Sequence, residues 1–168
     1  MKHLLAVAFL AAVAGTAHAG GQANSIGVGV ETQINEEAGG LSVNYDAGKF
    51  HVGGFLGFHD HADNDENNRS EFDIGARFFF HVHSTAMADF SLGGSIGLAS
   101  IPTGGPAPAP EGRDAHLYLE PGFQIRVFIA SNVALSFTGG IVIGTLDANR
   151  VDIAGQVDGL AGIHYYFF

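Results

Sequence analysis

The last twelve residues of the chain, VDGLAGIHYYFF at positions 157–168, say most about how it folds. Apolar residues recur at alternate positions, which is the two-residue period of a β-strand. The stretch finishes on four consecutive aromatic residues. A soluble protein gains little from such an ending, because chain ends usually lie in water and fray. A strand that crosses a membrane gains an anchor at the lipid–water interface, so the stretch predicts a membrane strand.

This ending resembles that of a known class of proteins. The closing strand of bacterial outer-membrane β-barrel proteins typically ends in a terminal Phe, with aromatic or apolar residues at alternate positions before it, and Phe168 fits this pattern. The resemblance implies that Phe168 is an insertion signal read by the barrel assembly machinery. It also implies outer-membrane lipids and lipopolysaccharide as the surroundings of the folded chain.

The beginning of the chain predicts a secretory signal peptide. An apolar run over 4–14 follows a short polar start, and a small-x-small cleavage site, AHA, ends at Ala19. The run is well short of the roughly 20 residues that a helix needs to span a bilayer. We therefore expect a removable signal peptide at 1–19 and one domain, a transmembrane β-barrel, at 20–168.

Composition excludes several classes of protein. The chain has no Cys, so no disulfide framework supports the fold, and no later stretch has about 18 consecutive apolar residues, which argues against a helical membrane protein. Without the signal peptide, six Lys and Arg stand against 17 Asp and Glu, a formal charge of −11. Nucleic acid is therefore excluded as a partner, because its phosphates need a basic surface.

Two-residue periodicity predicts eight strands in all, each with bulky apolar residues on one face and small or polar residues on the other. The predicted strands are 24–34, 41–46, 50–58, 72–83, 90–99, 117–129, 133–143 and 153–168. Pro121 is the one residue out of place, and it predicts a bulge or a locally missing hydrogen bond.

The connections between these strands alternate in length: medium, short, long, short, long, short, medium. They are 35–40, 47–49, 59–70, 84–88, 102–113, 130–132 and 147–152. An all-β, eight-stranded antiparallel up-and-down transmembrane barrel, with long loops outside and tight turns in the periplasm, predicts this alternation. A soluble lipocalin-like binding barrel is the architectural alternative, but the charges on the strand faces opposite the bulky residues argue against it.

Polar residues on the predicted inner face form the first candidate site. We expect a lumen filled by a polar network, with Arg77 and Arg126 paired against carboxylates. Its members are Glu31, Asp73, Arg77, Glu120, Gln124 and Arg126. A narrow ion or small-solute channel lined by the same residues is the alternative, although eight strands leave an interior only wide enough for side chains.

A loop rich in His and carboxylates is a weak candidate for a divalent cation site. Its ligands would be His59, His61, Asp63 and Asp65. The EF-hand spacing is missing, and an acidic, solvated loop explains the same residues. No cofactor is predicted.

Two further functions, catalysis on lipid and recognition at the cell surface, are considered from the residues that each would need. Some eight-stranded outer-membrane barrels are lipid-modifying enzymes, but no Ser, His and acid can be placed together here from spacing alone, so we predict no catalysis. The predicted outer loops are strongly acidic, which would repel lipopolysaccharide unless divalent cations bridge the two, and would attract cationic partners. We therefore predict a structural or surface-interaction role.

The last strand leaves one ambiguity. If Phe168 faced lipid, His164 and Asp158 would face lipid with it, which is unfavourable. The opposite parity, with Phe167 and Tyr165 outward, is more apolar and matches the other strands. We therefore expect His164 and Asp158 to point inward and Phe168 to lie at the periplasmic rim.

Overall fold

The structure is a computed structural model that describes residues 22–34, 38–61, 69–103, 112–147, 150–151 and 156–168. Eight long antiparallel strands form a closed barrel, and a ninth strand of two residues, β8, pairs only with β7. The strands are β1 (Ser25–Gln33), β2 (Ala38–Asp46), β3 (Phe50–His61), β4 (Arg69–Ser84), β5 (Ala88–Thr103), β6 (Gly112–Ala130), β7 (Val133–Asp147), β8 (Arg150–Val151) and β9 (Gln156–Phe167). The described residues contain no helix long and apolar enough to cross a membrane.

The barrel closes between its first and last long strands, β1 and β9. β1 pairs with β9 from Ile26 opposite Phe167 to Gln33 opposite Leu160. β6 also pairs with β7, so each long strand has a partner on both sides. A closed cylinder leaves no strand edge unpaired, which is required in lipid because lipid offers no hydrogen-bond partners. The predicted fold class is therefore confirmed.

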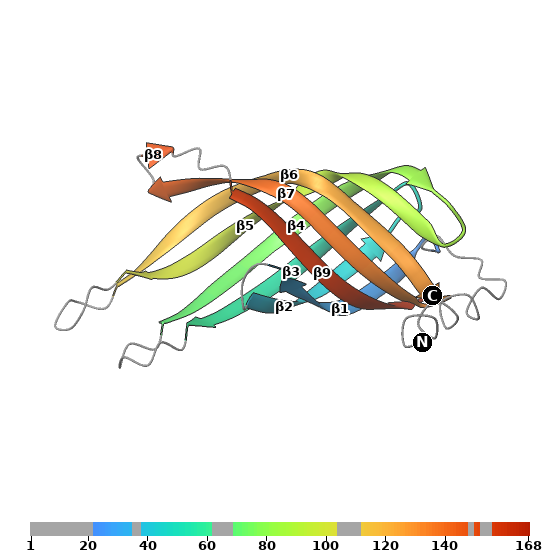
Figure 1. The fold of residues 1–168 in the computed structure, drawn as a ribbon, viewed down its shortest axis with the longest axis horizontal. Coiled ribbons are helices and arrows are strands. Elements are labelled where there is room, and N and C mark those ends of the chain that lie inside the picture. Colours follow the sequence, from blue (N-terminus) through green and yellow to red (C-terminus); the bar gives the residue numbers. More distant parts are fainter. Residues whose placement is uncertain (1–21, 35–37, 62–68, 104–111, 148–149, 152–155) are drawn as a thin grey trace, which may run out of the picture.

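Short turns, the start of β1 and the end of β9 gather at one end of the barrel. The connections at this end are 47–49, 85–87 and 131–132, and Figure 1 shows the C-terminus at the same end. Gly48 takes a positive φ of 86°, which glycine adopts without strain, and its N–H donates to Oδ1 of Asp46. We call this the turn end and the opposite one the loop end.

Bulky apolar side chains cover the outer surface, and polar ones fill the interior. Burial alternates along β1, β2 and β6, as a strand between lipid and lumen requires. On β9, Tyr165 and Phe167 are exposed, whereas His164 and Tyr166 are buried. The parity chosen for the last strand is therefore confirmed, while the side chain of Asp158 lies outside the described residues. Phe168 follows the strand and is exposed.

Several strands run further than the sequence predicted. β3 continues to His61, β4 begins at Arg69, β5 continues to Thr103 and β6 begins at Gly112. The predicted solvated loop 59–70 and the proline-rich loop 102–113 were therefore drawn too long. Polar residues obscured these ends, because the ladder hydrogen bonds that define a strand come from the backbone whatever the side chain.

Pro121 interrupts one ladder, as predicted, and does so without a bulge. It stays in register with Gly94 of β5. Towards β7, pairing is recorded up to Leu119 and resumes at Gly122, with no register shift between them. The bulge on this strand lies instead between Phe128 and Ala130, near the turn end.

The barrel wall is uneven in height. β1 and β2 have nine residues each, whereas β4, β5 and β6 have 16, 16 and 19. Figure 1 shows the β1–β2 hairpin stopping short of the level that β3 to β7 reach at the loop end. One side of the wall is therefore low.

Candidate functional site

The candidate site is the polar interior. All six residues of the predicted lumen network point inward: Glu31, Arg77, Glu120, Gln124 and Arg126 are buried and Asp73 is half-buried. Other inward polar residues add to them: Ser25, Ser42, Asn44, Asp46, His51, Asp89, Ser91, Ser95, Ser136, Thr138 and His164 are also buried.

Arg77 lies at the centre of the first group, which we call the Arg77 cluster (Glu31, Ser42, Arg77, Ser136 and His164). Nη1 and Nη2 of Arg77 donate to Oε1 and Oε2 of Glu31, both at 2.7 Å. Nε2 of His164 lies 3.2 Å from Oε1 of Glu31 and 2.6 Å from Oγ of Ser42. Oγ of Ser136 lies 3.3 Å from Nδ1 of His164. Five strands thus meet across the lumen, and the two-pronged Arg–carboxylate geometry holds them in a fixed register.

A glycine makes room for this cluster. A Cβ atom at Gly162 would lie 2.7 Å from Cγ of Glu31 and 2.7 Å from Oγ of Ser136. Real Cβ atoms do not approach other heavy atoms this closely, so a side chain here would push Glu31 or Ser136 out of place. Glycine at position 162 therefore leaves the space that this cluster occupies.

Arg126 organises a second group, the Arg126 cluster (Asp46, His81, Asp89, Arg126 and Tyr166). Its Nη2 donates to Oδ2 of Asp46 at 2.7 Å and to Oδ2 of Asp89 at 2.8 Å. Its Nη1 donates to the hydroxyl of Tyr166 at 2.9 Å. Asp46 and Asp89 are at the ends of β2 and β5 next to tight turns, so this cluster lies towards the turn end.

The partners of Arg126 differ from the prediction. We expected Arg126 against the carboxylates of Glu31, Asp73 and Glu120, but it pairs with Asp46 and Asp89. A signal for both existed in the sequence, because each shares the inward parity of its strand. The predicted fifth strand began at position 90, one residue after Asp89, so the prediction gave Asp89 no strand face.

His51 extends the Arg126 cluster through its contact with His81. Nδ1 of His81 lies 2.9 Å from the carbonyl oxygen of Gly48, which can only accept, so this nitrogen carries the proton. Nε2 of His81 is then the acceptor for Nη2 of Arg126 at 3.0 Å. Nδ1 of His51 lies 2.8 Å from Nε2 of His81. His83, two residues further along β4, is exposed.

The other predicted members make separate contacts. The hydroxyl of Tyr118 donates to the Asp73 carboxylate at 2.8 and 2.9 Å, nearer the loop end than Arg77. Nε2 of Gln124 donates to Oγ1 of Thr138 at 2.9 Å. The structure therefore divides the six predicted residues among several groups rather than joining them in one.

Most of the candidate cation site lies outside the described residues. His59 and His61 belong to β3, but their side chains are outside the described residues, as are Asp63 and Asp65 entirely. Among the residues described, no group of three or more His, Cys, Asp or Glu could hold a metal ion. The loop site stays a prediction.

Comparison with known proteins defines the class by fold. No protein-family model matches the sequence, and a search of curated proteins finds no match. Solved structures do match: the chain has the closed, eight-stranded antiparallel architecture of small outer-membrane barrels.

Three of these structures illustrate the likeness. The N-terminal β-barrel domain of OprF from Pseudomonas aeruginosa superposes with a TM-score of 0.55 and 13% identity, over 86% of this chain and 98% of that domain. Neisserial surface protein A gives 0.54 and 12%, over 85% and 94%. The attachment invasion locus protein Ail of Yersinia pestis gives 0.51 and 11%, over 87% and 100%. At such identities the likeness establishes the fold alone.

Proposed function

We propose that this protein is a bacterial outer-membrane β-barrel with a structural or surface-interaction role, whose lumen is closed by paired side chains. The observation that carries the proposal is the position of Arg126, which is 1% exposed and contacts residues of β2, β4, β5 and β9. The exposed apolar side chains around the barrel support placement in a bilayer.

Energetics favour a closed lumen over a pore. The interior of an eight-stranded barrel is just wide enough for side chains to fill it. Arg126 and its two carboxylates each lie against an opposite charge, so moving any one of them aside would leave a buried charge without compensation. The Arg77 pair adds a second layer of the same kind. An ion would have to break both layers to pass.

Planar-bilayer recording tests this part of the proposal. The refolded protein should give no steady unitary current, with a general porin in the same bilayers as the positive control. A steady open current of well-defined size would refute the closed lumen and support the alternative, a narrow channel. Unboiled samples should migrate differently from boiled ones on a gel, which verifies that the protein in the recording is a folded barrel.

An enzymatic role finds little support in the contacts. Serines, a histidine and a carboxylate do meet in the Arg77 cluster, where Ser136 and Glu31 lie on opposite ring nitrogens of His164. These side chains are buried, however, and both Glu31 oxygens are held by Arg77. A Gly-x-Ser-x-Gly spacing occurs at 93–97. In hydrolases that motif makes a sharp strand-to-helix turn, whereas here Ser95 is buried within β5.

The last part of the proposal concerns export of the chain, its insertion and the lipids that it meets. Export by the signal peptide at 1–19 and insertion by the barrel assembly machinery, with Phe168 as its signal, would bring the chain into contact with outer-membrane lipids. The acidic residues of the connecting segments would meet lipopolysaccharide through bridging divalent cations. The names of two structural neighbours, a surface protein and an attachment protein, agree with a surface role.

A further inference from the structure

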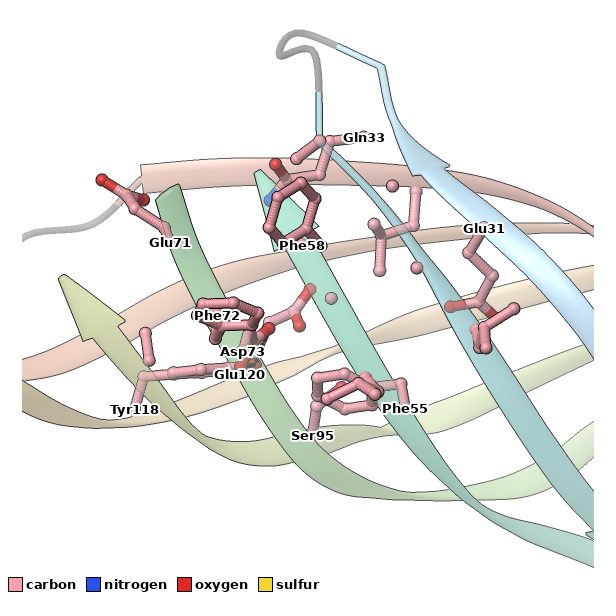
Figure 2. Close-up of a pocket in the computed structure, with 18 of the residues that line it drawn as sticks. Glu31, Gln33, Phe55, Phe58, Glu71, Phe72, Asp73, Ser95, Tyr118 and Glu120 are labelled. Atoms are coloured by element: carbon pink, nitrogen blue, oxygen red, sulfur yellow. Dashed lines mark hydrogen bonds between the residues drawn. The ribbon is translucent and has the colours of Figure 1, made fainter. Parts of the chain in front are cut away.

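A cavity of about 290 Å³ lies inside the loop end of the barrel, above the Arg77 cluster. Figure 2 shows Glu31 and Gln33 on one side of it and Asp73, Glu120 and Tyr118 on the other. It lies beside the low wall made by β1 and β2, whose residues 38–41 help to line it. The paired side chains below close its floor.

The inner face of the barrel changes character at this cavity. Near the turn end, inward positions of β7 and β9 carry Ser136, Thr138 and His164. Further towards the loop end on the same inward faces, β7 carries Val142 and β9 carries Leu160. Both side chains line the cavity. Apolar side chains that face an interior volume offer a surface for the apolar part of a ligand.

The charge of the lining is strongly one-sided. Among the described residues that line the cavity, four carry carboxylates, Glu31, Glu71, Asp73 and Glu120, and one, Arg77, carries a guanidinium. Arg77 gives two hydrogen bonds to Glu31, and the hydroxyl of Tyr118 donates to Asp73. A recess with low-dielectric walls and this lining concentrates cations and repels anions.

We propose that the cavity binds an organic ammonium ion: a primary amine on a compact apolar body. The ammonium group is held by the carboxylates on the Asp73 and Glu120 side, and the apolar body lies against Val142 and Leu160. The volume is at the small end of the range for ligand pockets, so it suits one ring or a short alkyl chain. A bare metal ion fits less well, since it would leave the apolar lining without a partner. The site is independent of whether the lumen conducts.

Titration with matched probes tests the charge requirement. Benzylammonium is added to the full mature barrel in zwitterionic nanodiscs, and amide and methyl NMR shifts are followed at Val142 and Leu160. Saturable shifts are expected with benzylammonium, with at least tenfold weaker binding of benzyl alcohol, which has the same ring and no charge. Equal binding of the two probes, or no saturable shift with benzylammonium, would overturn the proposal.

Variants localise the site. Asp73→Asn keeps an acceptor for Tyr118 and should weaken benzylammonium binding about tenfold, which corresponds to about 1.4 kcal/mol. Val142→Thr, which keeps the shape and adds a hydroxyl, should also weaken it. Asp114→Asn removes the same charge from an exposed position of β6 outside the cavity lining and should leave binding unchanged. An Asp73→Asn barrel that keeps its gel shift and binds like wild type would refute the site.

Discussion

Replacing Arg126 by Met should be among the most damaging single changes to this barrel. Arg126 compensates two carboxylates, and the three side chains are at most 1% exposed. Removing one partner of a buried ion pair typically costs about 3–5 kcal/mol. Because two carboxylates lose their partner here, we expect a loss at the upper end, about 5 kcal/mol. Asp46 retains a hydrogen bond from the N–H of Gly48. The loss of stability should therefore be less than twice that of a single broken ion pair.

The loss of stability in Arg126→Met should come more from the two buried carboxylates left without a cation than from the lost contacts. A triple variant, Arg126→Met with Asp46→Asn and Asp89→Asn, removes both buried charges and should recover about half of the lost stability, or 2–3 kcal/mol. Arg113→Met is the matched control, since Arg113 is an exposed arginine of the same strand. It should change stability by less than about 1 kcal/mol.

Urea titration of the protein refolded in phosphatidylcholine vesicles measures these differences, with the folded fraction read from gel mobility without boiling and from circular dichroism. A loss below about 1 kcal/mol for Arg126→Met would show that the cluster is not a buried ion-pair network. A triple variant less stable than the single one would refute the argument about stranded charge. Either result would also remove the main support for a closed lumen.

Two further changes test other parts of the structure. Gly162→Ala should destabilise the barrel by about 1–3 kcal/mol in the same titration, because its Cβ would collide with Glu31 and Ser136. Gly144→Ala is the control, since a Cβ there meets nothing within 4 Å. Equal losses of stability in the two variants would contradict the packing described around Gly162. Ile96→Arg, at an exposed apolar position of β5, should cost about 2–4 kcal/mol if it faces the middle of the bilayer. Ser84→Arg at the exposed end of β4 should cost much less, and a harmless Ile96→Arg would argue against a lipid-facing exterior.

The strand count and the direction of each side chain could be read from the sequence because they are local properties. Closure of the barrel could be expected from them because a strand in lipid cannot leave an edge unpaired. A two-residue period assigns each side chain to a face, and alternating connection lengths assign each turn to an end. Pro121 predicted a bulge or a missing hydrogen bond, since proline has no N–H to donate, and the ladder to β7 is interrupted there without a bulge. Strand ends were less predictable, because polar residues such as Asp60 and Arg69 can join a ladder through their backbone.

What the sequence by itself determined is therefore which residues enter the lumen. The tertiary structure decided which of them meet. Arg126 and Asp46 are 80 residues apart in the chain, and their contact depends on the register of all the intervening strands. Bulges at His81 to His83 and at Phe128 to Ala130 shift that register near the turn end. Because each strand's level in a closed barrel follows from its neighbours, a pairing across the lumen, or a cavity such as the one above Arg77, emerges only once the cylinder has closed.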